Sequence, residues 1–159
     1  MDITKEAKKR RLQDTLIIAG YGVIAFSVWS LAKTGLFLFL ADDDAIRQYF
    51  SVDDTYPLMM LFITTAIIIC IDVAVRAFVG LSARSEGRGK KKNPLYLIIA
   101  IFCGLLNAIS AIGIALGIGA TTSIMDSVIS VIIETTSLTA LVLVVYCSIS
   151  LRRLNKAAE

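Results

Sequence analysis

The sequence predicts an all-α protein: an integral membrane four-helix bundle with both termini cytoplasmic and a short interfacial helix in the first external loop. One reason is composition, since 57% of the 159 residues are hydrophobic, against roughly 45–50% in an ordinary soluble domain. The other reason is the distribution of hydrophobic residues along the chain. Four apolar runs, at about 15–40, 57–82, 94–118 and 126–151, are each long enough to cross the ~30 Å hydrocarbon core as one helix. Residues 1–159 are expected to form a single four-span membrane domain.

Three basic clusters next to the spans predict the orientation. Positively charged segments near span ends stay in the cytoplasm, and the spacing of the spans puts all three clusters on one side. We therefore expect a multi-pass protein of the cell (plasma) membrane with the N-terminus, the C-terminus and the 84–92 loop in the cytoplasm. The clusters are Lys5, Lys8, Lys9, Arg10 and Arg11; Arg84, Arg88, Lys90, Lys91 and Lys92; and Arg152, Arg153 and Lys156.

The same clusters indicate a partner. Each adjoins a hydrophobic span, where anionic headgroups on the cytoplasmic side of the lipid bilayer attract Lys and Arg. Nucleic acid, the usual alternative partner of basic clusters, is not expected. Tyr96, near the cytoplasmic end of the third span, is typical of a tyrosine that anchors a helix at the interface.

Residue usage argues against catalysis. The chain contains no histidine, and Cys70, Cys103 and Cys147 stand singly in apolar runs without a C-x-x-C pair. The commonest general base and the commonest zinc ligand are therefore missing, and isolated cysteines commonly behave as small buried hydrophobes. We expect no catalytic residue, no metal site and no cofactor, so the protein is not predicted to be an enzyme.

The first span carries one charge within its apolar run. Residues 1–14 are charged and compatible with a helix, and they lead into this span without glycine or proline. Lys33 lies about 17 residues beyond the start of the span, which corresponds to roughly 25 Å of helix. We therefore place Lys33 in the outer part of the membrane.

The first external loop, 41–56, is acidic and contains the predicted interfacial helix. Asp44 can cap this helix, in which Ile46, Tyr49 and Phe50 recur at helical spacing and form an apolar edge for the outer membrane surface. Carboxylates are hard oxygen ligands, so a divalent-cation site serving an enzyme that acts on lipid is a third hypothesis. The spacing matches no calcium-binding loop, which favours a solvated acidic turn.

The second span holds two charges, Asp72 and Arg76, four residues apart and hence on one helix face. Unpaired charges in a membrane are expensive. We expect the two to pair within the helix, with Arg76 also reaching toward the inner headgroups.

The third span has no charge but is rich in small residues, with Asn107 near its middle. Small residues at helical spacing let helix backbones approach closely in lipid, so we predict that this span is the packing centre. Gly113-x-x-x-Gly117 can serve either contacts within the monomer or dimerisation. The predicted packing residues are Gly104, Ala108, Ala111, Gly113 and Gly117.

A polar stripe marks the outer half of the fourth span. Its members, Ser127, Ser130, Glu134 and Ser137, repeat at intervals of three, four and three residues, so they share one helix face. This face must contact protein or water. Glu134 lies at about the same depth as Lys33, and we predict that these two opposite charges pair, because an unpaired charge would be costly there.

The intramembrane polar residues allow two interpretations. Asp72 with Arg76 and Lys33 with Glu134 can be structural ion pairs that lock the bundle, or Lys33, Asn107 and Glu134 can line a polar pathway. Short loops and the lack of a catalytic set favour a non-enzymatic accessory or regulatory subunit that packs against another membrane protein or forms a homo-oligomer. The alternative is a small oligomeric transporter or channel with an outward-facing polar pathway.

Overall fold

The computed structural model describes residues 3–40, 42–50, 57–90, 94–116 and 124–156, and these are helical apart from short turns. Four of the five helices are long and apolar enough to cross a membrane, which confirms the prediction of an all-α chain with four potential spans. The helices are α1 (Ile3–Leu40), α2 (Asp43–Phe50), α3 (Leu58–Gly87), α4 (Leu95–Ala115) and α5 (Ile124–Lys156).

Proline and glycine mark the ends of the helices. Pro57 and Pro94 stand immediately before α3 and α4, and their carbonyl groups accept hydrogen bonds from Met60 and Leu97. Proline is favoured there because its missing N–H would have no partner in the first turn. After α3 the chain turns at Gly89, whose φ of 82° is the left-handed conformation that glycine adopts without strain.

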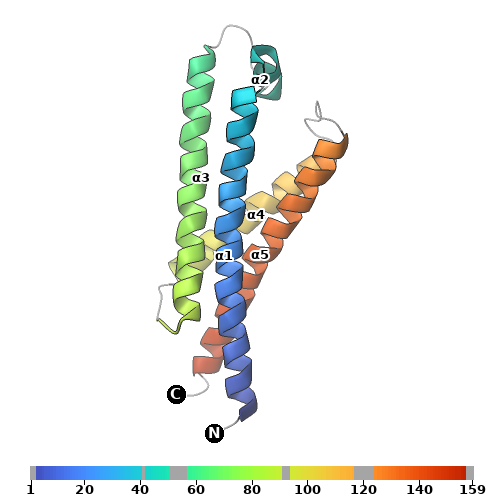
Figure 1. Cartoon of the computed structure of the whole chain (residues 1–159). Helices are drawn as coiled ribbons and strands as arrows, with labels where there is room; N and C mark the ends of the chain where they lie inside the picture. Colours follow the sequence, from blue (N-terminus) through green and yellow to red (C-terminus); the bar gives the residue numbers. More distant parts are fainter. Residues whose placement is uncertain (1–2, 41, 51–56, 91–93, 117–123, 157–159) are drawn as a thin grey trace.

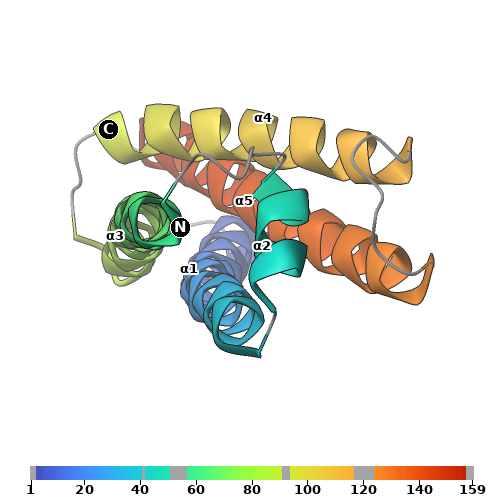
Figure 2. The same cartoon turned by 90° about the horizontal axis from the view of Figure 1, so that it is seen from above.

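The long helices form two antiparallel pairs, α1 with α3 and α4 with α5 (Figure 1). Both termini lie at one end of the molecule, named here the terminal end, and α2 lies at the opposite end, named the α2 end. The two pairs pack as layers, with α5 against α1 (Figure 2). They are close near the terminal end and diverge toward the α2 end.

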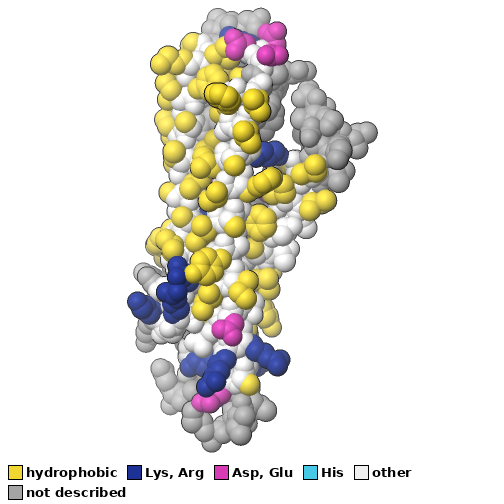
Figure 3. All heavy atoms as spheres, viewed as in Figure 1, with side chains coloured by type: hydrophobic (Ala, Val, Ile, Leu, Met, Phe, Trp, Pro, Cys, Tyr) yellow, Lys and Arg dark blue, Asp and Glu magenta, His cyan; other side chains and the backbone are white. Residues whose placement is uncertain are grey.

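The buried apolar core lies on the terminal side of this divergence and joins all four long helices. Outward-facing side chains are mostly large and apolar, and they form a hydrophobic band around the middle of the visible face (Figure 3). A surface of this kind is suited to lipid and not to water. The core includes Leu16, Val23, Val79, Ala100, Leu141 and Val144.

The helices α1 and α3 approach each other closely where two glycines face each other. A Cβ atom on Gly20 would lie 2.7 Å from the Gly80 carbonyl oxygen, and one on Gly80 would lie 2.6 Å from that of Gly20. Two turns further along α3, a Cβ on Gly87 would lie 2.7 Å from Ile17 Cγ1. Only glycine permits so close an approach of two backbones.

The prediction that the third span is the packing centre is therefore wrong. Gly104 has ordinary contact with α5, since a Cβ there would lie 3.8 Å from Leu138 Cδ1, and a Cβ on Gly113 would meet nothing within 4 Å. Ala108 and Ala111 are half-buried, while Gly117 lies outside the described residues. The physical reason is that α4 is at the edge of the bundle, so its small residues have few helices to approach.

Three helices extend past the predicted spans. Because charged residues are good helix formers outside lipid, α1 begins at Ile3, α3 continues to Gly87 and α5 continues to Lys156. The predicted short helix of the first loop is α2, but Ile46 is only 1% exposed. That side chain is covered by protein. The side chains of Tyr49 and Phe50 fall outside the described part.

Candidate functional site

Arg76 of α3 is the centre of a polar network that joins three helices. Its Nε donates a hydrogen bond to Asp72 Oδ1 (2.9 Å), Nη1 donates to Ser137 Oγ on α5 (3.0 Å), and Nη2 donates to Asn107 Oδ1 on α4 (2.9 Å). Asn107 Nδ2 also donates to Ser137 Oγ (2.9 Å). These four residues, Asp72, Arg76, Asn107 and Ser137, are named the Arg76 network.

The network shows how a charge is held between apolar helices. Arg76 and Asp72 pair within α3, but the predicted reach of Arg76 toward the inner headgroups is wrong, because its guanidinium points between α4 and α5 and the side chain is 12% exposed. Three acceptors satisfy three of its donors there. A planar guanidinium suits such a site because its donors point in fixed directions.

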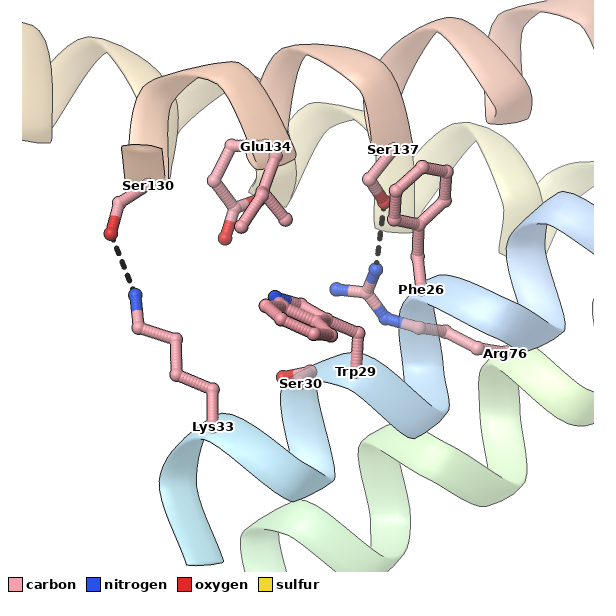
Figure 4. Close-up of a pocket in the computed structure, with 9 residues that line it drawn as sticks. Phe26, Trp29, Ser30, Lys33, Arg76, Ser130, Glu134 and Ser137 are labelled. Carbon is pink, nitrogen blue, oxygen red and sulfur yellow. Dashed lines mark hydrogen bonds between the residues drawn. The ribbon is translucent and has the colours of Figure 1, made fainter. Parts of the chain in front are cut away.

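A polar groove opens next to the network, where α1 and α5 diverge toward the α2 end. It encloses a cavity of about 50 Å³, which is enough for a few water molecules. Charged and hydroxyl side chains from α1, α3 and α5 point into this space, together with the Trp29 ring (Figure 4). The lining residues are Phe26, Trp29, Ser30, Lys33, Arg76, Ser130, Ile133, Glu134 and Ser137.

The predicted ion pair between Lys33 and Glu134 is not formed in the described part of the chain. Lys33 Nζ instead donates to Ser130 Oγ (2.6 Å), one turn nearer the α2 end of α5 than Glu134. The Glu134 carboxylate points into the groove, where it interacts electrostatically with Arg76 and Lys33 (Figure 4). Equal depth along the bundle therefore does not by itself select the partner, since Lys33 reaches α5 one turn away from Glu134.

The polar stripe of α5 faces this groove. Ser130, Glu134 and Ser137 all line it, and Ser137 is buried by its contacts with Arg76 and Asn107. The side chain of Ser127 lies outside the described residues. The groove ends at the Arg76 network, because the helices on the terminal side of the network are joined by the apolar core around Leu141 and Val144.

Sequence reasoning missed a second polar cluster, at the terminal end. Arg152 of α5 donates from Nε to Glu86 Oε1 (2.7 Å) and from Nη2 to Glu86 Oε2 (2.9 Å), and Tyr96 of α4 also donates to Glu86. A further hydrogen bond joins Tyr96 Oη and Ser148 Oγ, 2.8 Å apart. The set Glu86, Tyr96, Ser148 and Arg152 is named the Glu86 cluster. It ties α3, α4 and α5 together.

One signal for this cluster was present in the sequence. Glu86 is the single acidic residue within the basic stretch 84–92, and an acidic side chain there has several possible cationic partners. Tyr96 is predicted to anchor at the interface and Arg152 to contact headgroups, but both side chains point inward to Glu86. The predicted second span ends at 82, so Glu86 falls in the predicted loop and not on a helix.

The described residues contain no group of three His, Cys, Asp or Glu side chains that could hold a metal ion. Asp42, Asp43 and Asp44 are exposed at the α2 end, while the acidic residues at 53 and 54 fall outside the described ranges. Comparison of the chain with protein-family models, with curated proteins and with solved structures finds no match.

Proposed function

We propose that the chain is a non-enzymatic accessory or regulatory subunit of the cell membrane, and that it binds a membrane-spanning helix of another protein in the groove between α1 and α5. The observation that carries this proposal is the divergence of the two helix pairs, which leaves Lys33 and Glu134 in an open groove without direct contact to each other. Charged side chains next to hydrocarbon are costly, so such a groove needs protein or water against it.

Charge distribution supports an orientation for this subunit. Arg84, Arg88 and Lys90 lie at the terminal end of α3, whereas Asp42 and Asp43 lie at the α2 end. Figure 3 shows Lys and Arg concentrated near the terminal end, with a few acidic side chains among them, and a group of acidic side chains at the opposite end. By the positive-inside rule the terminal end is cytoplasmic. The groove then opens into the outer half of the membrane.

The closed floor of the groove favours a docking site over a pore. Polar side chains reach as far as the Arg76 network, and beyond it Val23, Leu141 and Val144 are packed in the apolar core. A polar solute that entered the groove would meet this core. A helix that lies along the groove needs no path through it.

The chemistry of the groove defines the partner. Lys33 uses one of its three donors on Ser130, so a partner helix would offer it an acceptor, such as a carboxylate or an amide oxygen. Glu134 accepts from no donor within the described residues, so the same helix would offer a hydroxyl or amide donor at that level. Hydrogen bonds between membrane helices are typically worth about 0.6–2 kcal/mol each.

Photocrosslinking in native membranes tests this function. A benzophenone amino acid at Trp29 or Ser30 would face the groove, while one at Ile98 or Ile109 would face away from it, since both isoleucines are exposed on α4. We expect one defined protein adduct from the groove positions, none from the α4 positions, and loss of the adduct in Lys33→Leu. Adducts with lipid alone would contradict the proposal. Adducts with a second copy of the chain would indicate a homo-oligomer instead.

A small oligomeric transporter or channel is the second candidate function. Its supporting observation is the series of polar groups that lines the groove, from Lys33 and Glu134 to Arg76, with Asn107 hydrogen-bonded to Arg76 behind it. This function predicts flux of a small ion or organic cation in liposomes, and loss of that flux in Glu134→Gln at unchanged stability. Flux equal to that of empty liposomes for every solute tested would contradict the transporter or channel function and favour the docking function.

A further inference from the structure

Arg84 differs from Arg76 and Arg152 in the partner of its side chain. Arg76 pairs with Asp72 and Arg152 pairs with Glu86, but no described carboxylate contacts Arg84. Its guanidinium instead lies over the Tyr21 ring of α1, with Cζ 4.8 Å from the ring centroid. A stacked guanidinium keeps its in-plane donors available to an anion.

The close approach of α1 and α3 holds this arginine in place. The backbone nitrogen of Arg84 would lie 3.3 Å from a Cβ on Gly20, so α3 rests on α1 at this residue. The side chain must therefore leave along the surface of α1, where Tyr21 is the next residue. Its Nε is buried and has no hydrogen-bond partner among the described residues, so protein encloses the side chain as far as the start of the guanidinium.

Two further cations follow on the same segment. Arg88 is four residues after Arg84, hence on the same face of α3, and its backbone N–H donates to the Arg84 carbonyl oxygen (3.1 Å). Gly89 then turns the chain so that Lys90 N–H donates to the Ser85 carbonyl oxygen (3.2 Å). Arg88 and Lys90 are both exposed, so this end of α3 presents positive charge to its surroundings.

The surface next to Arg84 is apolar in the direction of the α2 end. Ala77 and Leu81 precede Arg84 by seven and three residues and so share its face, and Val28 follows Tyr21 by seven residues on α1. Leu81 and Val28 are more than half exposed. Figure 3 shows that Lys and Arg gather at the terminal side of the hydrophobic band. Arg84 therefore lies where a phosphate layer would meet a hydrocarbon layer.

From this arrangement we propose that Arg84 and Tyr21 form a binding site for the phosphodiester of an anionic phospholipid. Two Arg84 donors bind the phosphate oxygens, while the acyl chains lie along the apolar surface of Ala77, Leu81 and Val28. Arg88 and Lys90 favour a lipid with net negative charge over a zwitterionic one. A soluble phosphate could use the same donors, but it would gain nothing from the apolar surface beside them.

Native mass spectrometry of the full chain in neutral detergent tests the site. The protein is mixed with equal amounts of phosphatidylglycerol and phosphatidylcholine that have the same acyl chains, and the lipids retained are counted. We expect preferential retention of phosphatidylglycerol and a loss of about tenfold in Arg84→Gln, as expected for a charged bidentate contact. The control is Arg153→Gln, which removes the same charge from an exposed position on α5 and should reduce retention less than about twofold.

Two further variants separate binding from folding. Arg84→Lys keeps the charge but loses the planar pair of donors, and Tyr21→Leu keeps an apolar contact but loses the stacked ring; each should reduce retention by about threefold at unchanged helix content by circular dichroism. Unchanged retention in Arg84→Gln and in Tyr21→Leu would overturn the site. Equal losses in Arg84→Gln and Arg153→Gln would show attraction by overall charge alone. Displacement of the lipid by an equal concentration of inorganic phosphate would show that the ligand is a soluble anion.

Discussion

Arg76 Nη2 on α3 lies 2.9 Å from Asn107 Oδ1 on α4. The sequence pattern pairs Arg76 with Asp72 alone, and it gives no partner for Asn107. Through this hydrogen bond, and through the bond to Ser137, the α4 and α5 pair is attached to α3 halfway along the molecule. Toward the α2 end the pairs diverge. The Arg76 network is therefore the boundary between a packed half and an open half of the bundle.

Arg76→Met should destabilise the protein by about 2 kcal/mol, because it removes three hydrogen bonds at about 0.6 kcal/mol each in a membrane setting. Unfolding in mixed micelles of neutral detergent and SDS measures this loss. Arg153→Met, an exposed arginine of α5, is the matched control and should change stability by less than about 0.5 kcal/mol. Equal effects of the two variants would mean that the Arg76 network does not hold the helices together.

Gly20→Ala should destabilise the protein by about 1–3 kcal/mol, because its Cβ would lie 2.7 Å from the Gly80 carbonyl oxygen and would force α1 and α3 apart. The control is Gly113→Ala, where a Cβ meets nothing within 4 Å. That change should be neutral or stabilising by up to about 1 kcal/mol, since alanine is the better helix former. The same unfolding assay compares the two. A larger loss in Gly113→Ala would restore α4 as the packing centre.

Lys33 and Glu134 should be only weakly coupled in stability, because they interact across the groove without direct contact. Because the structure joins Lys33 to Ser130 and not to Glu134, the losses from Lys33→Met and Glu134→Leu should add within about 0.5 kcal/mol in the double variant. The equivalent cycle with Asp72→Leu and Arg76→Met should show clear coupling, because these two residues are 2.9 Å apart. Strong rescue in the Lys33 and Glu134 double variant would indicate that they pair after all.

Arg152→Met should destabilise the protein more than Tyr96→Phe does. The first change leaves the Glu86 carboxylate, whose side chain is only 8% exposed, without its cation, at a cost of about 3–5 kcal/mol. The second removes one hydroxyl that bonds Glu86 and Ser148, at a cost of about 1 kcal/mol. Thermal denaturation in detergent gives the order of the two. Replacing Glu86 by Leu in the Arg152→Met background should recover part of the loss.

Several features of the protein could be predicted from the sequence because they depend on local order along the chain. The four apolar helices follow from runs of hydrophobic residues long enough to cross lipid. The contact between Asp72 and Arg76 follows from their four-residue spacing on one helix. The polar stripe of α5 faces a protein groove because a row of hydroxyl and carboxylate groups is costly against hydrocarbon.

The tertiary structure alone decided which helices meet and at what level. Glycines on α1 and α3 approach each other while those on α4 meet little, and nothing in the composition of these helices distinguishes the two cases. Lys33 reaches Ser130, 97 residues away, and Arg152 reaches Glu86, 66 residues away, because of the crossing of the two helix pairs. Each helix presents several similar apolar faces, and the choice among them depends on side-chain packing and on the angle between helices, which hydropathy along a single chain does not encode.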